Sequence, residues 1–449
     1  MELVSLPIGP AGPAPLIARP MQQQPPEMEV GGVRWWVRTG FLCALIVVTC
    51  RVFAVSHVLE IIGLVEGLSS AAFVAWAVWR LAERWLLNDW KITGLEIYCM
   101  VLALVPLWSA INAQRVFGQP VIYGLIAFKD FYLFLGALHI YRLLRQGFFT
   151  LKQLETAFLL IAWTAVIYFY LASLFIDPGP WLDTPLAGAN EIKGAGTYYR
   201  FNMMIVFFGA IYYTARAFTR QQWLYLLHAL VFVCYVIFFR VDRTSIVVML
   251  IGMAGVVLFH ANAKVIGRFV LMGILPLLLG AVLVVQLAPG VVDQYTTMFG
   301  DALNTLMGEG GAGGEVSVRA YEKLTAERYI DRNPLLGNGR MGSQWIEGGY
   351  EHFLGYFFPA DVGYLGIAFI YGWPVTIFLY AQFIIAAIYL LRVRRQGNDI
   401  FHMACKFLVL SVCLDSLTNG FLTQFAGQAM LLTCIAHHYS RLHKVPAVA

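Results

Sequence analysis

The chain has 449 residues, of which 59% are hydrophobic and 13% are charged, and its formal net charge is +5 at pH 7. A soluble domain is closer to half apolar and a quarter charged, so this composition excludes an ordinary water-soluble protein. The modest positive charge fits orientation in a membrane better than nucleic-acid binding, and we expect no nucleic-acid partner. Apolar runs of about twenty residues, long enough to cross a bilayer as helices, follow one another along the chain. Since helices satisfy their own backbone groups in lipid, we predict an all-α, polytopic integral membrane protein.

The order of apolar and polar segments predicts five regions. Residues 1–33 are rich in Pro, Gly and Gln and are expected to be a disordered cytoplasmic tail. Residues 34–288 would form nine transmembrane helices, 289–360 a large polar loop, 361–440 three further helices and 441–449 a cytoplasmic tail. All seven cysteines fall inside the predicted spans, and no acidic cluster has metal-ligand spacing. We therefore predict no disulfide framework, no metal site and no cofactor.

The chain thus contains about twelve predicted transmembrane helices. In chain order they are Thr39–Val58, Gly63–Trp79, Thr93–Ile111, Val121–Tyr141, Leu154–Phe175, Tyr198–Phe218, Trp223–Phe239, Thr244–His260, Val265–Ala288, Asp361–Leu391, Phe401–Leu417 and Phe421–His438. The tenth contains Gly372-Trp373-Pro374, which predicts a kink. With both termini in the cytoplasm, the short basic loops all fall on the inner side, as the positive-inside rule requires. The outer side then receives the long polar loop.

Several arginines and one histidine are exceptions to this charge bias, because the topology brings them to the outer surface. They are Arg200, Arg240, Arg243, Arg319 and His352. Guanidinium groups suit a diphosphate because they stay charged and can bind two oxygens at once. An imidazole titrates near neutrality and suits the removal of a proton from a hydroxyl group. Together these groups could bind a lipid diphosphate and activate an alcohol that attacks the attached group.

Plainer interpretations exist for each of these groups. Arg240 is more readily explained by pairing with Asp242 or with lipid phosphates. Taken alone, His352 is a loop residue, and Arg328, Arg332 and Arg340 are interpreted as solvated or paired loop residues. Lys129 and Asp130, inside the fourth span, are interpreted as a structural pair, although an intramembrane charge is always a candidate site.

Short motifs in the second half of the chain occur in a characteristic order. Arg319 is followed by Pro334-Leu335-Leu336-Gly337-Asn338-Gly339, and then by His352, Asp361, Gly363 and Gly366. In this order and spacing the chain resembles the O-antigen polymerase and O-antigen ligase superfamily of bacterial membrane glycosyltransferases. Arg243 and Arg200 resemble two further arginines of that family. Phe353 and Asp242 depart from it, standing where the family has Asn after the histidine and Ser before the arginine.

The resemblance implies a GT-C-like fold and a metal-independent, inverting reaction on undecaprenyl-diphosphate-linked glycan at the periplasmic face of the bacterial inner membrane. His352, Arg243 and Arg319 would be catalytic, and Arg200, Arg240, Arg243 and Arg319 would bind the diphosphate. The departures leave open whether Arg240 or Arg243 is the functional arginine. Membrane lipid and a chain-length regulator are the further partners that it implies.

Supporting roles are expected for Gly337, Gly339 and Gly363 in the turns, and for Asp361. The carboxylate of Asp361 would either orient His352 or cap the tenth span, where an acidic residue at a helix N-terminus is favourable. Three functions remain open: an exopolysaccharide or O-antigen polymerase, a ligase to the lipid A core, and a transporter or flippase of lipid-linked sugars. A polymerase is preferred over a ligase because no feature marks a core-binding site. A transporter is disfavoured because the sequence gives no sign of matching broken helices.

Overall fold

The computed structural model describes residues 32–53, 60–87, 92–177, 187–190, 196–199, 201–240, 242–260, 267, 300, 315–342, 344–393, 399–420, 422 and 424–442. The statements below apply to these ranges. Side chains are not described for residues 60–63, 187–190, 196–199, 243, 260 and 315–318. Residues 1–31 of the predicted disordered tail, the ninth span Val265–Ala288 apart from Gly267, and residues 443–449 of the predicted cytoplasmic tail lie outside the described residues.

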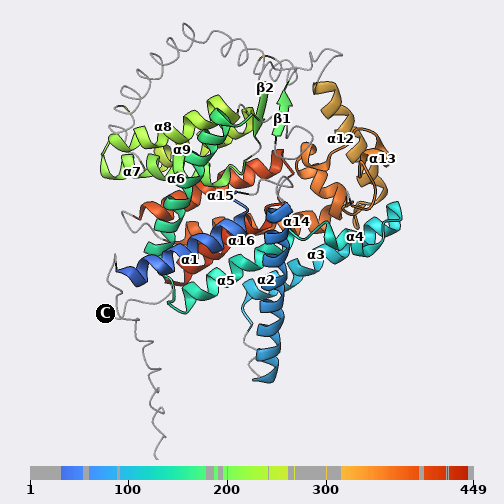
Figure 1. The fold of residues 1–449 in the computed structure, drawn as a ribbon, viewed down its shortest axis with the longest axis horizontal. Helices are drawn as coiled ribbons and strands as arrows, with labels where there is room; N and C mark the ends of the chain where they lie inside the picture. The colour runs from blue at the N-terminus through green and yellow to red at the C-terminus, as the bar shows by residue number, and fades with distance from the viewer. Residues whose placement is uncertain are drawn as a thin grey trace, which may run out of the picture.

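The described part of the chain is a helical bundle with one short β-hairpin (Figure 1). Its α-helices are α1 Val33–Cys50, α2 Glu60–Leu86, α3 Gly94–Phe117, α4 Val121–Ile126, α5 Phe134–Arg145, α6 Leu151–Phe175, α7 Met204–Arg220, α8 Leu224–Tyr235, α9 Arg243–His260, α12 Glu315–Arg332, α13 Glu351–Leu354, α14 Tyr364–Arg392, α15 Ile400–Thr418 and α16 Ala426–Leu442. Three short helical turns accompany them, η1 Phe131–Leu133, η4 Val236–Arg240 and η5 Pro359–Val362. Strand β1 Ala187–Asn190 pairs antiparallel with β2 Gly196–Tyr199.

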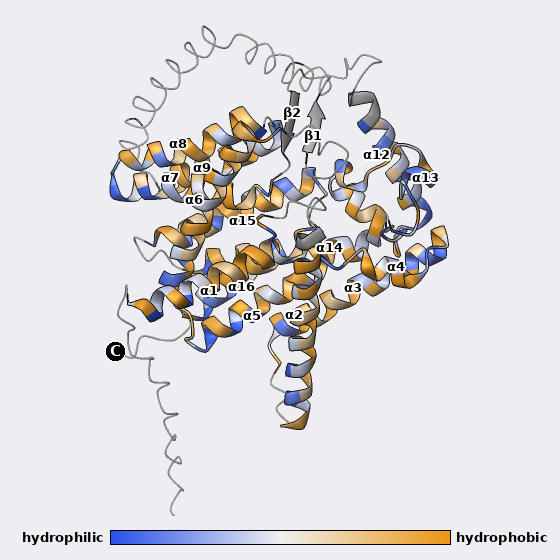
Figure 2. Ribbon diagram, viewed as in Figure 1, coloured by the Kyte–Doolittle hydropathy of each residue, from blue (hydrophilic) through white to orange (hydrophobic). Residues whose placement is uncertain are grey.

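Six of these helices are long and apolar enough to cross a membrane, and two shorter segments are also apolar. The six are Val33–Cys50, Leu64–Leu86, Gly94–Phe117, Leu151–Phe175, Tyr364–Arg392 and Ile400–Thr418; the shorter two are Leu224–Arg240 and Thr244–Phe259. Hydrophobic residues occupy much of the length of the helices (Figure 2), and many of their large side chains are exposed on the outside of the bundle. On α6, for example, Ile167, Leu171 and Leu174 are all exposed. An exposed apolar surface of this extent marks contact with lipid, so the chain is a multi-pass α-helical membrane protein.

The observed helices follow most of the predicted spans, with two clear differences. The predicted fourth span, Val121–Tyr141, is broken: α4 ends at Ile126, and α5 begins only at Phe134. The predicted sixth span, Tyr198–Phe218, begins too early, because Tyr198 lies in β2 and the helix starts at Met204. Hydropathy could not separate these states, since apolar residues fill strands, turns and helices alike when they are buried.

Close helix packing in the core depends on small residues. Gly209 of α7 lies directly under the ring of Phe232 of α8, and Gly255 of α9 lies under Phe407 of α15. Small residues at these crossings let neighbouring backbones approach, which is how helices associate in lipid. As a result α7 is buried almost along its whole length between α6, α8, α9 and α15.

A second interruption lies in α14. Gly372 has φ 75° and ψ 165°, which no helical residue adopts, and Pro374 follows two residues later. This confirms the predicted kink in the tenth span, and its cause is the residue pair that predicted it. The described region therefore contains two interrupted helices, one at residues 127–130 and one at Gly372.

The polar segment 315–364 collects at one end of the bundle, where Figure 1 shows α12 and α13 close to α14. We call this end the loop face. The ends of α1 and α15 and the start of α16 also lie there, because Arg51 donates a hydrogen bond to Gln424 O and Gly420 N donates one to Ala360 O. The opposite end of the bundle carries the end of α2, the start of α3 and the end of α5.

Candidate functional site

The Pro334–Gly339 turn is inserted into the break of α14. Asn338 N and Gly339 N donate to the carbonyls of Phe369 and Ile370, both at 2.8 Å, and Trp373 N donates to Pro334 O at 2.8 Å. The turn therefore satisfies backbone groups that the break at Gly372 would leave without partners. Unpaired backbone groups inside a bilayer cost several kcal/mol each, so the turn and the break stabilise one another.

Glycine is required at two positions of this turn. Gly337 has φ +70° and Gly339 has φ +83°, a left-handed region that disfavours side chains. A Cβ atom at Gly337 would overlap the backbone of Gly372, and one at Gly339 would overlap the backbone of Ala113 in α3. These two motif glycines therefore hold the segment against α14 and α3, and their role is positional.

Side chains of α3 and of the segment after it fix the other side of the turn. Asn112 Nδ2 donates to Leu336 O at 2.9 Å, and Ser109 Oγ accepts from Arg340 N at 2.8 Å. Gln119 accepts from Gly342 N and donates to Arg340 O. Because the backbone groups of the turn are hydrogen-bonded to α14 on one side and to α3 and Gln119 on the other, the turn forms a rigid base for α12 and α13.

Tyr350 connects this base to α13. Its hydroxyl donates to Gly339 O at 2.7 Å and accepts from Met341 N at 3.1 Å. Burial raises the pKa of the Tyr350 hydroxyl well above its usual range, with the Met341 N–H and Arg340 opposing the shift. The phenol therefore stays protonated and acts as a structural link.

A buried carboxyl group lies beside two of the predicted site residues. Glu322 of α12 is 1% exposed, and its Oε1 accepts from Phe358 N at 3.0 Å. Burial raises the pKa of Glu322 to about 7; the Phe358 N–H and Arg319 oppose the shift, and the nearby Asp361 adds to it. The structure thus brings Arg319, Glu322 and Asp361 together near the N-terminal end of α12. A carboxyl that titrates near neutrality suits general acid–base chemistry.

Glu322 was missed by the sequence analysis, although one signal for it existed. Glu322, Ala326 and Ile330 are spaced i, i+4, i+8, and all three are buried on one face of α12. An acidic residue at the head of such an apolar stripe is unusual. Without a predicted helix at 315–332, the stripe could not be recognised.

His352 lies on α13, whereas the residues of this cluster lie on α12 and η5. It is exposed, and its ring packs edge-on against Phe353, with the ring centroids 5.0 Å apart. Phe353 in turn stacks on Trp345. The imidazole of His352 has no hydrogen bond or ion pair with any other described residue. The side chain is accessible to a substrate at the loop face.

Asp361 does not occupy the N-cap of α14, one of the two positions expected for it. It lies in η5, and the N-cap position of α14 is Gly363, with φ +59°. A Cβ at Gly363 would overlap the carbonyl of Leu417 at the end of α15. Gly363 is therefore the residue that lets η5 and α14 join tightly against α15, and Asp361 lies near enough to Glu322 to act on its carboxyl electrostatically.

The predicted arginines are only partly described. Arg200 lies outside the described residues, and Arg243 is described only as the first backbone position of α9. Arg319 is exposed on α12. Arg240 ends η4 and interacts electrostatically with Asp415 of α15. Hence the predicted diphosphate-binding set is not seen as one group in the described part of the chain.

Asp242 caps the helix that follows it. Its carboxylate accepts from Thr244 N at 3.1 Å and from Ser245 Oγ at 2.8 Å, which caps the start of α9. Asp415 instead extends the polar region toward the motif. Asn419, one turn after it, donates to it, and the next residue, Gly420, binds Ala360 O. The end of α15 therefore links the Arg240 region to η5.

An ion cluster fills the break between α4 and α5. The guanidinium of Arg51, 9% exposed, binds both carboxylate oxygens of Glu66, at 2.9 and 3.0 Å, and Oδ2 of Asp130 at 3.0 Å. Asp130 therefore pairs with Arg51, and the expected pairing with Lys129 is wrong. Three elements far apart in sequence supply this cluster, so no local pattern could predict it.

Arg340 also differs from the solvated loop residue that was expected. Its guanidinium lies over the ring of Phe128, 5.1 Å from the centroid, and Nη1 is buried with no hydrogen-bond partner among the described residues. Phe128 in turn contacts Tyr371, next to the break in α14. Arg340 thus places a cation between the two interrupted helices.

These features define a class: a multi-pass α-helical membrane protein whose large polar segment is docked into an interrupted helix and carries titratable groups at one face. No family model matches the chain, and no curated protein is similar to it. The particular activity is therefore argued from the site itself.

Proposed function

We propose that this protein is a bacterial inner-membrane glycosyltransferase that transfers or polymerises undecaprenyl-diphosphate-linked glycan repeats at the periplasmic face, as an exopolysaccharide or O-antigen polymerase. The observation that carries this proposal is the clustering of Arg319, Glu322 and Asp361 at the loop face. It places a cation and a carboxyl with a pKa of about 7 at one membrane surface. The motif order from Arg319 to Gly366 supports the same assignment.

The reaction requires a base, an electrophilic carbon and a stabilised leaving group. His352 removes the proton from an acceptor sugar hydroxyl, whose oxygen forms a bond to the anomeric carbon of the donor. The bond from that carbon to the diphosphate oxygen breaks, and the diphosphate leaves on its lipid carrier. Arg319, Arg243 and Arg200 would stabilise the charge that develops on it. A positioned base contributes about 10²- to 10⁴-fold, and each electrostatic stabiliser about 3–4 kcal/mol.

Two groups compete for the role of base. His352 is exposed and free to turn toward a substrate, whereas Glu322 is buried but has the appropriate pKa. Glu322 is also close to Arg319, which would hold the diphosphate. We assign the base to His352 and the positioning of Arg319 to Glu322, and the two variants His352→Ala and Glu322→Gln separate these roles.

A second function, transport of lipid-linked sugars, gains support from a specific observation. The sequence argument against a transporter was that no matching broken helices were predicted. Both α4–α5 and α14 are interrupted, with Arg51, Asp130 and Arg340 at the breaks. Interrupted helices with polar groups are typical of transporter binding sites. A ligase to the lipid A core would use the same groups as the polymerase and differ only in its acceptor.

The orientation follows from the positive-inside rule, with both termini in the cytoplasm and the loop face toward the periplasm. In this orientation the large segment 289–360 meets lipid-linked glycan after its export. A chain-length regulator would then contact the same face.

The experiment that tests the function compares surface and secreted polysaccharide on gels. A deletion strain is complemented with wild type, His352→Ala or Glu327→Gln, the last being a control on the partly exposed face of α12. A polymerase leaves single-repeat lipopolysaccharide, or no long exopolysaccharide, in the deletion strain and with His352→Ala. Loss of all glycan from the lipid core, with accumulation of lipid-linked polymer, identifies a ligase. Full restoration by His352→Ala refutes the base assignment and favours transport.

A further inference from the structure

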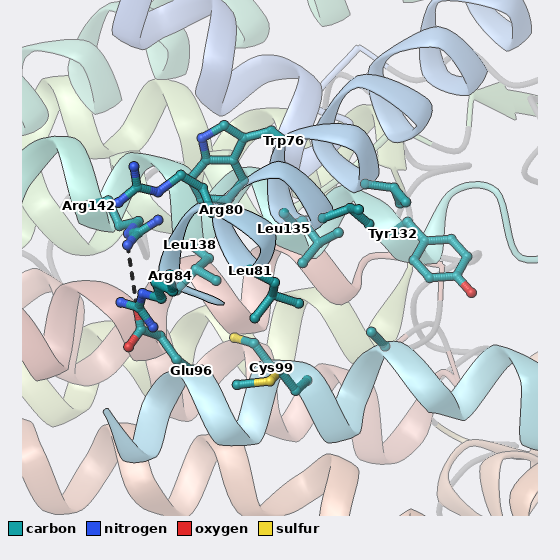
Figure 3. A pocket seen from close by; sticks show the side chains of 15 residues that line it. Trp76, Arg80, Leu81, Arg84, Glu96, Cys99, Tyr132, Leu135, Leu138 and Arg142 are labelled. Atoms are coloured by element: carbon teal, nitrogen blue, oxygen red, sulfur yellow. Dashed lines mark hydrogen bonds and ion pairs between the residues drawn. The ribbon is translucent and has the colours of Figure 1, made fainter. Parts of the chain in front are cut away.

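A cavity at the end of the bundle opposite the loop face combines an apolar slot with a cationic end. It has a volume of about 170 Å³ and lies between α2, α3 and α5. In Figure 3, Arg80, Arg84 and Arg142 gather near Glu96, and Leu81, Leu135 and Cys99 line the remainder. None of these residues belongs to the site at the loop face.

The slot is open toward lipid. Two of its lining residues, Val78 and Leu81, are 59% and 42% exposed on the outer side of α2. Pockets that enclose a drug-sized ligand have about 300–1,000 Å³, so a slot of about 170 Å³ is too small to enclose such a molecule. Its size and openness suit one segment of an acyl chain that enters from the bilayer.

The cationic end has more positive than negative groups. Arg84 pairs with Glu96 at 2.8 Å, and Arg142 is 3.8 Å from the same carboxylate oxygen. Arg80 pairs with Glu83, and its Nε is buried with no hydrogen-bond partner among the described residues. Three guanidinium groups thus share two carboxylates. An anionic headgroup would supply the missing acceptor oxygens, because guanidinium groups bind phosphate through paired hydrogen bonds.

We propose that this cavity binds an anionic diacyl phospholipid, with its phosphate at Arg80 and Arg142 and one acyl chain in the slot between α2 and α3. Basic pockets between transmembrane helices on the cytoplasmic side are typical sites for such headgroups. The occupant stabilises α2, which has few other contacts: only 11% of its apolar window is buried in the protein. This site does not depend on the transferase activity.

The test measures lipid affinity in the whole protein. Purified protein is delipidated in a neutral detergent and titrated with phosphatidylglycerol or phosphatidylcholine, and bound lipid is counted by native mass spectrometry. We expect phosphatidylglycerol to bind more tightly and to raise the melting temperature. Arg80→Gln should lower the ratio of the two affinities about fivefold, and Arg80→Gln with Arg142→Gln about twenty-five-fold, since each arginine contributes about 1 kcal/mol to attraction of an anionic lipid.

Two further variants separate the site from general surface charge. Arg145→Gln, one turn after Arg142 and outside the cavity lining, carries the same charge change and should keep the lipid preference. Ala103→Phe fills the slot and should weaken both lipids while leaving the charges intact. Folding of every variant is checked by its melting temperature in phosphatidylcholine.

Three results would overturn the proposal. Equal affinity for phosphatidylglycerol and phosphatidylcholine would show that the arginines do not select an anionic headgroup. An equal loss of preference with Arg145→Gln assigns the effect to surface charge. Tighter binding of undecaprenyl phosphate than of phosphatidylglycerol assigns the cavity to a single-chain carrier.

Discussion

The buried carboxyl of Glu322 should make the α12 segment less stable as the pH rises. In the unfolded chain this carboxyl loses its proton near pH 4.5, whereas burial raises its pKa to about 7 in the folded protein. Between these two values the unfolded state binds fewer protons than the folded state, so the free energy of unfolding falls with increasing pH. The loss begins near pH 4.5, is complete slightly above pH 7 and is absent at lower pH.

The shift sets the magnitude of this effect. A difference of about 2.5 pKa units corresponds to about 3.4 kcal/mol at most. Relaxation of the surroundings around the charged form recovers part of it, which leaves about 2 kcal/mol. Glu322→Gln removes the ionisation but keeps an oxygen that can accept from Phe358 N. The variant should therefore be more stable than wild type at pH 8 by about 2 kcal/mol and equal to it near pH 4.5.

Hydrogen exchange of α12 amides in nanodiscs measures this locally, between pH 5 and 8 and after correction for the intrinsic exchange rate. We expect the protection of residues 319–330 to fall with pH in wild type and to be flat in Glu322→Gln. Glu327→Gln, on the same helix but 44% exposed, provides the matched control and should behave as wild type. Equal pH dependence of wild type and Glu322→Gln would refute the assignment of a buried, neutral carboxyl.

Further variants test the docked turn, the ion cluster and the proposed base. Gly339→Ala should lower the free energy of unfolding by more than about 3 kcal/mol, because its Cβ would overlap α3 and its φ is unfavourable. Gly118→Ala is the control: it has a similar φ of +81° but open space around it, so it should cost about 1 kcal/mol. Similar melting temperatures of the two variants would contradict the close docking of the turn. Arg51→Met should lower the free energy of unfolding by about 3–5 kcal/mol and reduce the yield of monodisperse protein. Adding Asp130→Asn should restore part of the lost stability, because it removes one uncompensated charge. If the second substitution restores nothing, the ion pair is not important. His352→Ala should reduce glycan product about 10²- to 10⁴-fold with an unchanged melting temperature, and a drop in melting temperature would show that the histidine has a structural role.

The two interrupted helices bear on how the loop face works. Charged groups lie at or near both breaks, and the Pro334–Gly339 turn satisfies backbone groups at the one in α14. Because the turn and the α14 break share hydrogen bonds, the end of α12 is tied to α14 at Gly372. The same contacts make the glycines of the motif indispensable for folding, whatever chemistry occurs above them.

The sequence alone was sufficient to predict that the chain is a membrane protein and where most of its helices lie. Apolar runs of the length of a bilayer have one stable backbone state in lipid, so their identity follows from local composition. Gly372 and Pro374 predicted the kink in α14 for the same local reason. Gly337, Gly339 and Gly363 were singled out only through the family resemblance, and the structure adds that each has a positive φ.

Only the tertiary structure decided which polar groups meet. The break between α4 and α5 lies in an apolar run, and it is stabilised by Arg51 and Glu66 from other helices. The raised pKa of Glu322 likewise requires the enclosure provided by η5 and the start of α14. Burial and ion pairing depend on distances between segments remote in sequence. Hydropathy and spacing describe neighbours along the chain, so they could predict the helices but not the partners of these charges.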